Sequence, residues 1–114
     1  MKNKIVLVPF PFDDLSSAKV RPAVCLTDEM GQHSHVILAF ITSKIPSDLL
    51  HTDLVLETSA SDFVMTGLKL SSTVRLHRLA TVSASVVQLE LGELSDSQRD
   101  QVDERIRQLF DLNQ

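Results

Sequence analysis

The sequence of 114 residues contains no tryptophan, no tyrosine, one cysteine and three glycines. Cys25 cannot form an internal disulfide, and its apolar setting, AVCLT, predicts a buried side chain rather than a nucleophile. Three glycines are too few for a loop that cradles phosphates. Any aromatic cage for a ligand would have to use the five phenylalanines.

Long apolar runs and metal-ligand motifs are missing too. No segment is apolar over a length that spans a bilayer, so we expect a soluble, cytoplasmic protein with one domain over residues 1–114 and no membrane partner. The histidines fit no HExxH motif, and only His33 and His35 are spaced to share a strand face. We predict no metal site and no cofactor. A GxSxG hydrolase motif is also absent.

The net charge of −4 is unevenly distributed along the chain. Residues 90–114 hold seven acidic and three basic side chains, whereas residues 1–89 hold eight of each. Within the balanced part, residues 15–27 and residues 63–89 carry basic side chains and no acidic ones. These two basic segments could bind a polyanion; alternatively, they are ordinary solvated charges.

The hydrophobic pattern predicts short strands. Apolar and β-branched runs place them at 5–8, 22–27, 35–41, 53–57, 71–83 and 86–91. Residues 9–21, with two prolines and two aspartates, are expected to form a long loop. Gly31 and Gly67 are expected in turns, and Gly92 at the end of the last strand. The alternation breaks at Arg78, which predicts that the strand pairing either bulges or ends nearby.

The C-terminal segment has the pattern of a helix. Ser95 and Gln98 match a capping box. The apolar side chains of this segment are expected on one stripe, which consists of Val102, Ile106, Leu109 and Phe110. Several strands followed by one helix predict a mainly β (α+β) fold, with a small β-barrel and a helix packed outside it.

Polar side chains gather at the expected strand ends and on one strand face: Arg21, Thr42, Ser43, Arg75 and His77. If the second and third strands are an antiparallel pair, Arg21 lies beside Thr42. The alternative is that Arg21 pairs with Asp13 or Asp14 and that Thr42 serves only its loop.

The stretch IVLVPFPFDDLSSAKVRPAVCL at 5–26 resembles the opening of the MazF/PemK-like toxins of type II toxin–antitoxin systems. The resemblance continues through FITS at 40–43, GLKLSSTVRLHRLATV at 67–82 and LGELS at 91–95, and so covers nearly the whole chain in order. It implies an SH3-like barrel of about six to seven strands with a C-terminal helix. It also implies a homodimer, an antitoxin partner and a metal-independent, sequence-specific endoribonuclease acting on single-stranded RNA.

The resemblance further implies roles for single residues. Arg21 matches the family's catalytic arginine and Thr42 its catalytic threonine, with Arg75 as a further phosphate contact. His77 stands where some relatives have an aspartate, and we expect its imidazole to share the acid and base work. RNA contacts are expected from Lys19, Ser43 and Arg78. The chain also departs from the family at Asn3-Lys4, where relatives have Gly-Asp.

Two other functions fit the same resemblance. One is a gyrase-poisoning toxin, which would act by protein contact and need no catalytic residues. The other is a catalytically inactive barrel that only binds a partner. An RNA-cleavage assay separates these from the nuclease.

Overall fold

The computed structural model describes residues 1–10 and 19–112. Their regular elements, in chain order, are β1 (Lys4–Phe10), β2 (Lys19–Cys25), β3 (His35–Thr42), β4 (Asp53–Leu56), the 3₁₀ helix η2 (Phe63–Thr66), β5 (Ser72–Ser83), the 3₁₀ helix η3 (Ala84–Val86), β6 (Leu89–Glu93) and α1 (Asp96–Leu109). None of the described helices has the length and hydropathy needed to cross a bilayer.

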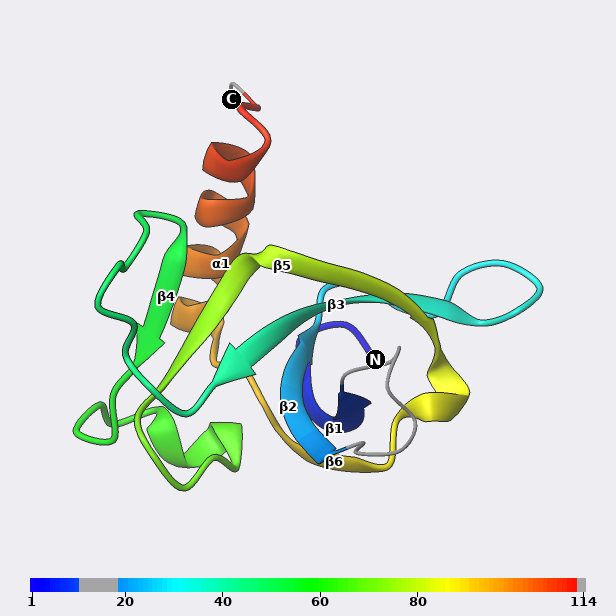
Figure 1. Cartoon of the computed structure of the whole chain (residues 1–114), viewed down its shortest axis with the longest axis horizontal. Helices are drawn as coiled ribbons and strands as arrows, with labels where there is room; N and C mark the ends of the chain where they lie inside the picture. The colour runs from blue at the N-terminus through cyan, green and yellow to red at the C-terminus, as the bar shows by residue number, and fades with distance from the viewer. Residues whose placement is uncertain (11–18, 113–114) are drawn as a thin grey trace.

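The strands form one antiparallel sheet in the order β4-β5-β3-β2-β1-β6. The sheet curls into a half-barrel, in which the long β5 runs from β4 along the whole of β3 (Figure 1). Helix α1 packs beside β4 and the first part of β5. The expected mainly β fold with one C-terminal helix is therefore confirmed.

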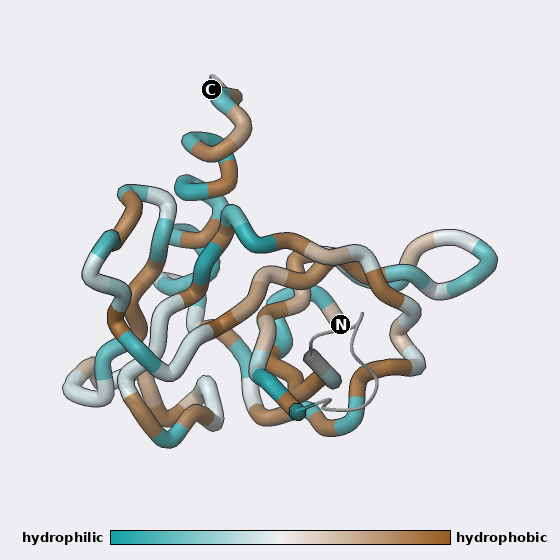
Figure 2. The backbone as a smooth tube through the Cα atoms, in the orientation of Figure 1, coloured by the Kyte–Doolittle hydropathy of each residue, from teal (hydrophilic) through white to brown (hydrophobic). Residues whose placement is uncertain are grey.

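Apolar residues alternate between the two faces of the curled sheet, because successive strand side chains point to opposite sides. Val24 and Val74 belong to the cluster that packs with Val102 of α1. The other cluster contains Cys25 and Leu38, whose side chains lie on the opposite face of the sheet. In Figure 2 hydrophobic (brown) stretches run along the strands at the centre of the molecule and also through segments at its lower edge. Cys25 is buried as predicted, and this burial raises the pKa of its thiol to about 11.

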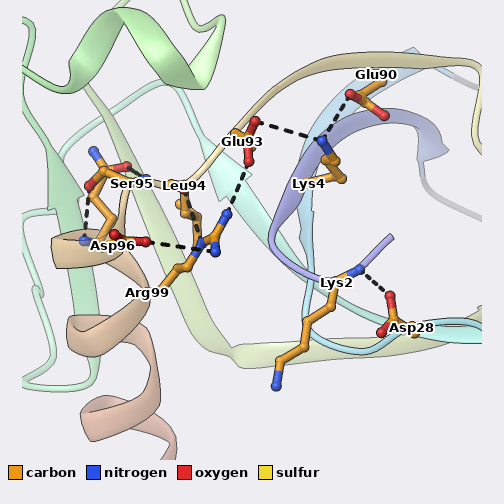
Figure 3. A network of polar contacts seen from close by, with 10 residues as sticks. Lys2, Lys4, Asp28, Glu90, Glu93, Leu94, Ser95, Asp96 and Arg99 are labelled. Carbon is orange, nitrogen blue, oxygen red and sulfur yellow. Dashed lines mark hydrogen bonds and ion pairs between the residues drawn. The ribbon is translucent and has the colours of Figure 1, made fainter.

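Helix α1 begins at the predicted capping box. The Gln98 backbone N–H donates to Ser95 Oγ at 3.1 Å, and the Ser95 N–H donates to Gln98 Oε1 at 2.8 Å. Figure 3 shows how this first turn is joined to the sheet. Arg99 Nη2 donates to Glu93 Oε2 at 3.0 Å, and Lys4 Nζ lies 3.7 Å from the same carboxylate. The start of the helix is therefore tied to β6 and β1.

The predicted last strand was wrong in its bounds. Val86 lies in η3, and Gly92 is inside β6 rather than at its end. The reason is tertiary: a Cβ on Gly92 would lie 2.2 Å from the backbone oxygen of Met65 in η2. Glycine is needed there for close packing, not for a turn.

The predicted loop at 9–21 is shorter than expected. β1 continues through Pro9 to Phe10, and β2 begins at Lys19, where the two strands still pair. Pro9 is tolerated because β6 pairs with β1 only up to Leu7, so its missing N–H removes no ladder bond. The middle of the predicted loop lies outside the described residues.

Candidate active site

A pocket of about 290 Å³ opens where β2 begins and β3 ends. Its lining consists of Arg21, Pro22, Phe40, Ile41, Thr42, Ser43, Lys44, Arg75 and Arg78. The fold thus brings together five residues that the sequence singled out, from three strands and the loop after β3. Lys44 was not among the predicted site residues.

Pro22 explains why the sheet opens at this point. Leu26 N–H donates to Ile37 on β3, whereas Cys25 accepts a bond from Asn3, so even-numbered residues of β2 direct their backbone groups toward β3. Pro22 is in this phase but has no N–H to donate. The β2–β3 ladder accordingly ends at the pair Ala23 and Phe40, next to the pocket.

Arg21 and Thr42 face the same pocket, as the predicted antiparallel pairing requires. Continuing the β2–β3 register by two residues sets one opposite the other. The Arg21 side chain is exposed and forms no ion pair with a described residue. The alternative partners of Arg21, Asp13 and Asp14, lie outside the described residues.

The lining is strongly basic. Four of its nine residues are Lys or Arg, and none is acidic. A partly enclosed site with charge of one sign attracts the opposite charge, so the pocket suits an anion. Two hydroxyl side chains, on Thr42 and Ser43, add hydrogen-bond donors that a phosphate could accept.

Arg75 is held by a carboxylate that the sequence analysis missed. Its Nε donates to Asp53 Oδ1 at 3.2 Å, and its Nη2 donates to Asp53 Oδ2 at 3.0 Å. The Asp53 side chain is fully buried, whereas 16% of the Arg75 side chain is exposed. The hydrogen bonds to Asp53 raise the pKa of Arg75 above its ordinary value. Arg75 therefore keeps its charge at the edge of the pocket.

Of the two outcomes expected near Arg78, a bulge or an end of the pairing, β5 has the bulge. Phe40 on β3 pairs with Arg75 and the preceding Ala39 pairs with Leu79, so residues 76–78 have no partner on β3. Because the bulge resets the alternation, Arg75 and Arg78 both line the pocket although they are three residues apart.

Two predicted site residues do not line the pocket. His77 is 35% exposed at its side chain, and its Nδ1 lies 3.9 Å from Asp53 Oδ1. Lys19 is exposed at the start of β2, where it pairs with Phe10 of β1. Over residues 1–10 and 19–112, no three His, Cys, Asp or Glu side chains are grouped so that they could hold a metal ion.

Comparison with known proteins gives a consistent picture. The family model for the PemK-like, MazF-like toxin of type II toxin–antitoxin systems matches residues 1–110. No curated protein matches the chain. A solved endoribonuclease from a mycobacterial species, in complex with its cognate antitoxin, is similar in fold, with a TM-score of 0.74 at 12% identity, covering 100% of this chain and 97% of that one. The Mycobacterium tuberculosis toxin MazF-mt6 is also similar, with a TM-score of 0.70 at 24% identity, covering 96% and 99%.

Proposed function

The chain belongs to the PemK-like, MazF-like toxin family of type II toxin–antitoxin systems, and on this premise we propose that it is an endoribonuclease of the cytoplasm that cuts single-stranded RNA. The observation that carries the proposal is the pocket itself, which has four cationic side chains, two hydroxyls and no carboxylate in its lining. Phosphodiester groups of RNA are the anions that such a pocket would take.

The reaction we propose is attack of a ribose 2′-OH on the adjacent phosphorus. The bond from phosphorus to the 5′-oxygen breaks, leaving a 2′,3′-cyclic phosphate on one product and a 5′-OH on the other. Negative charge builds up on the phosphate oxygens, and fixed cations stabilise it. The same lining disfavours a divalent cation because it offers positive charge and no acidic ligands, so we propose that the reaction is independent of metal ions.

Arg21, Arg75 and Thr42 would share the phosphate. Each guanidinium can donate to two phosphate oxygens at once, and the Thr42 hydroxyl can donate to another. The arginines supply charge rather than protons, because a guanidinium does not lose its proton in proteins. Ser43 and Arg78, which also line the pocket, and Lys19, at the exposed start of β2, would contact neighbouring parts of the RNA.

The protons have to move through another group. The sequence-based candidate is His77, whose imidazole suits proton transfer near neutral pH as a class. It lies beside Asp53 and not in the pocket lining. An acid or base role therefore requires the bound RNA to extend beyond Arg75 to His77. A proton-transfer role for His77 stays a prediction.

The family premise also supports two partners. We propose that the chain forms a homodimer, with RNA bound along both subunits. We propose further that an antitoxin segment, extended and acidic or apolar, lies across the pocket and competes with RNA. The similarity in fold to a toxin bound to its antitoxin is consistent with the second proposal.

Purified protein with excess chelator and a mixed-sequence single-stranded RNA tests the proposed reaction. We expect cleavage at short sequences, with 2′,3′-cyclic phosphate and 5′-OH ends identified by mass spectrometry of the fragments. A DNA strand of the same sequence is the control and should stay intact, because it lacks the attacking 2′-OH. Cleavage that needs added Mg²⁺, or no cleavage together with gyrase inhibition, would refute the proposal.

A further inference from the structure

We propose that Asp53 is a positioning residue that fixes the Arg75 guanidinium for phosphate binding. Asp53 does not line the pocket, so it would act through Arg75 and not on the RNA. The inference rests on the proposed function, since it assigns Asp53 a part in that reaction. Asp53 lies on β4, a strand that contributes no residue to the pocket lining.

Both oxygens of the Asp53 carboxylate accept hydrogen bonds. Oδ1 accepts from Arg75 Nε, and Oδ2 accepts from Arg75 Nη2 and from the Leu50 backbone N–H at 2.9 Å. His77 Nδ1 lies 3.9 Å from Oδ1. The side chain has no exposed surface. A carboxylate without water around it depends on these partners, so its position is strongly determined.

The pairing leaves Arg75 able to bind an anion. A guanidinium carries five N–H donors, and the bidentate pair with Asp53 uses one on Nε and one on Nη2. The other three donors are not used by Asp53, although Asp48 Oδ1 lies 3.9 Å from Nη2. An arginine fixed in this way loses less rotational freedom when it binds phosphate than a solvated one does. Asp53 thus fixes the position of the Arg75 guanidinium and occupies only two of its N–H donors.

Asp53 also holds the loop that follows β3. The Asp53 N–H donates to the Leu50 oxygen at 3.0 Å, which closes a reciprocal pair with the Leu50 N–H bond. At the other end of the loop, Thr73 Oγ1 donates to the Lys44 oxygen at 3.0 Å. The loop bearing Lys44 is therefore fixed at both ends on the strands that carry Arg75 and its carboxylate.

A double-mutant cycle with Asp53→Asn and Arg75→Lys tests the proposal. Asp53→Asn keeps the size of the side chain but removes its charge, and we expect kcat to fall about 10²-fold from misplacement of Arg75, with a smaller change in KM. In the Arg75→Lys background, the same substitution should lower kcat little further, because the positioned group is already gone. Equal losses in both backgrounds would mean a general structural role and would overturn the proposal.

The control variant is Arg105→Gln. Arg105 Nε donates to the Asp53 backbone oxygen at 2.9 Å, so this change weakens the attachment of α1 to β4 and leaves the carboxylate intact. It should lower the unfolding temperature without a comparable loss of cleavage. If Asp53→Asn does not fold, Arg75→Lys alone decides. It keeps the charge but not the two-oxygen pairing, so a loss of kcat of about 10²-fold, like that expected of Asp53→Asn, supports the proposal and a full rate overturns it.

A readout without RNA separates this proposal from the proposed function. In the wild type, the ¹H–¹⁵N signal of Arg75 Nε should be protected from solvent exchange and should shift on titration with inorganic phosphate. Both properties should be lost in Asp53→Asn. If the wild type shows them but cuts no RNA, the proposed function is wrong and the positioning stands. If the signal and its phosphate response are the same in both proteins, the positioning is wrong whatever the protein cuts.

Discussion

Arg21 and Arg75 both line the pocket, but their side chains are held in different ways. Arg21 is exposed, lies near the start of β2 and has no ion pair with a described residue. Arg75 is mostly buried and is fixed through two bonds to a carboxylate on the neighbouring strand. Both deliver positive charge to one pocket. The position of Arg21 comes from its own strand, whereas that of Arg75 depends on a side chain 22 residues away in the sequence.

This difference separates function from stability. Removing an exposed, unshared charge should affect the ligand and leave folding alone. Removing a charge that compensates a buried carboxylate should affect both. Substitutions at the two arginines therefore offer the sharpest test of the comparison.

The largest effect on cleavage is expected from Arg21→Ala. Loss of a fixed donor to the phosphate should lower kcat by about 10²–10³-fold and weaken RNA binding. The unfolding free energy should change by less than about 0.5 kcal/mol. Single-turnover cleavage, RNA titration and denaturant unfolding measure the three quantities. Cleavage near the wild-type rate would remove Arg21 from the site.

Arg75→Ala should also reduce cleavage, and in contrast to Arg21→Ala it should destabilise the protein. It leaves the Asp53 carboxylate buried without its cation, at a cost of about 3 kcal/mol in unfolding free energy. The double variant Asp53→Asn/Arg75→Ala should recover part of that stability but none of the cleavage. If Arg75→Ala is as stable as Arg21→Ala, the comparison drawn here fails.

His77→Asn tests whether the imidazole carries protons. If it does, cleavage should fall by about 10²-fold and lose its pH dependence between about pH 5 and 8, with RNA binding kept. Asparagine preserves a hydrogen-bonding side chain but cannot titrate. A wild-type rate across that pH range would show that His77 takes no part in proton transfer.

The smallest effect is expected from Pro22→Val, which supplies the missing backbone N–H at the mouth of β2. That N–H should bond to the Ile41 oxygen and so extend the β2–β3 ladder toward Arg21. We expect cleavage to fall only a few-fold, about threefold, because the pocket narrows while its charges stay. Hydrogen exchange at position 22 gives the readout, and fast exchange there would show that Pro22 is not what ends the ladder.

Local patterns in the sequence were sufficient to predict the start of α1 and much of this site. The capping box at Ser95, the bulge near Arg78 and the meeting of Arg21 with Thr42 all follow from periodicity and from the pairing of consecutive strands. Asp53 was missed because its partner is set by the register of β4 on β5, which the sequence does not state. A carboxylate at the start of an otherwise apolar strand, DLVL, was the one available signal. The prediction for Gly92 was wrong for the same kind of reason, because this glycine is required by close packing against the backbone of η2, which is distant in the sequence.

The most direct test of the account is a crystal structure of the protein with a short RNA whose 2′-hydroxyl groups are replaced by 2′-O-methyl, so that it binds without being cut. The account predicts one phosphate in the pocket, within hydrogen-bond distance of the Arg21 and Arg75 guanidinium groups and of the Thr42 hydroxyl, with the Asp53 pair unchanged. RNA bound elsewhere on the surface, with this pocket lacking a phosphate, would contradict it.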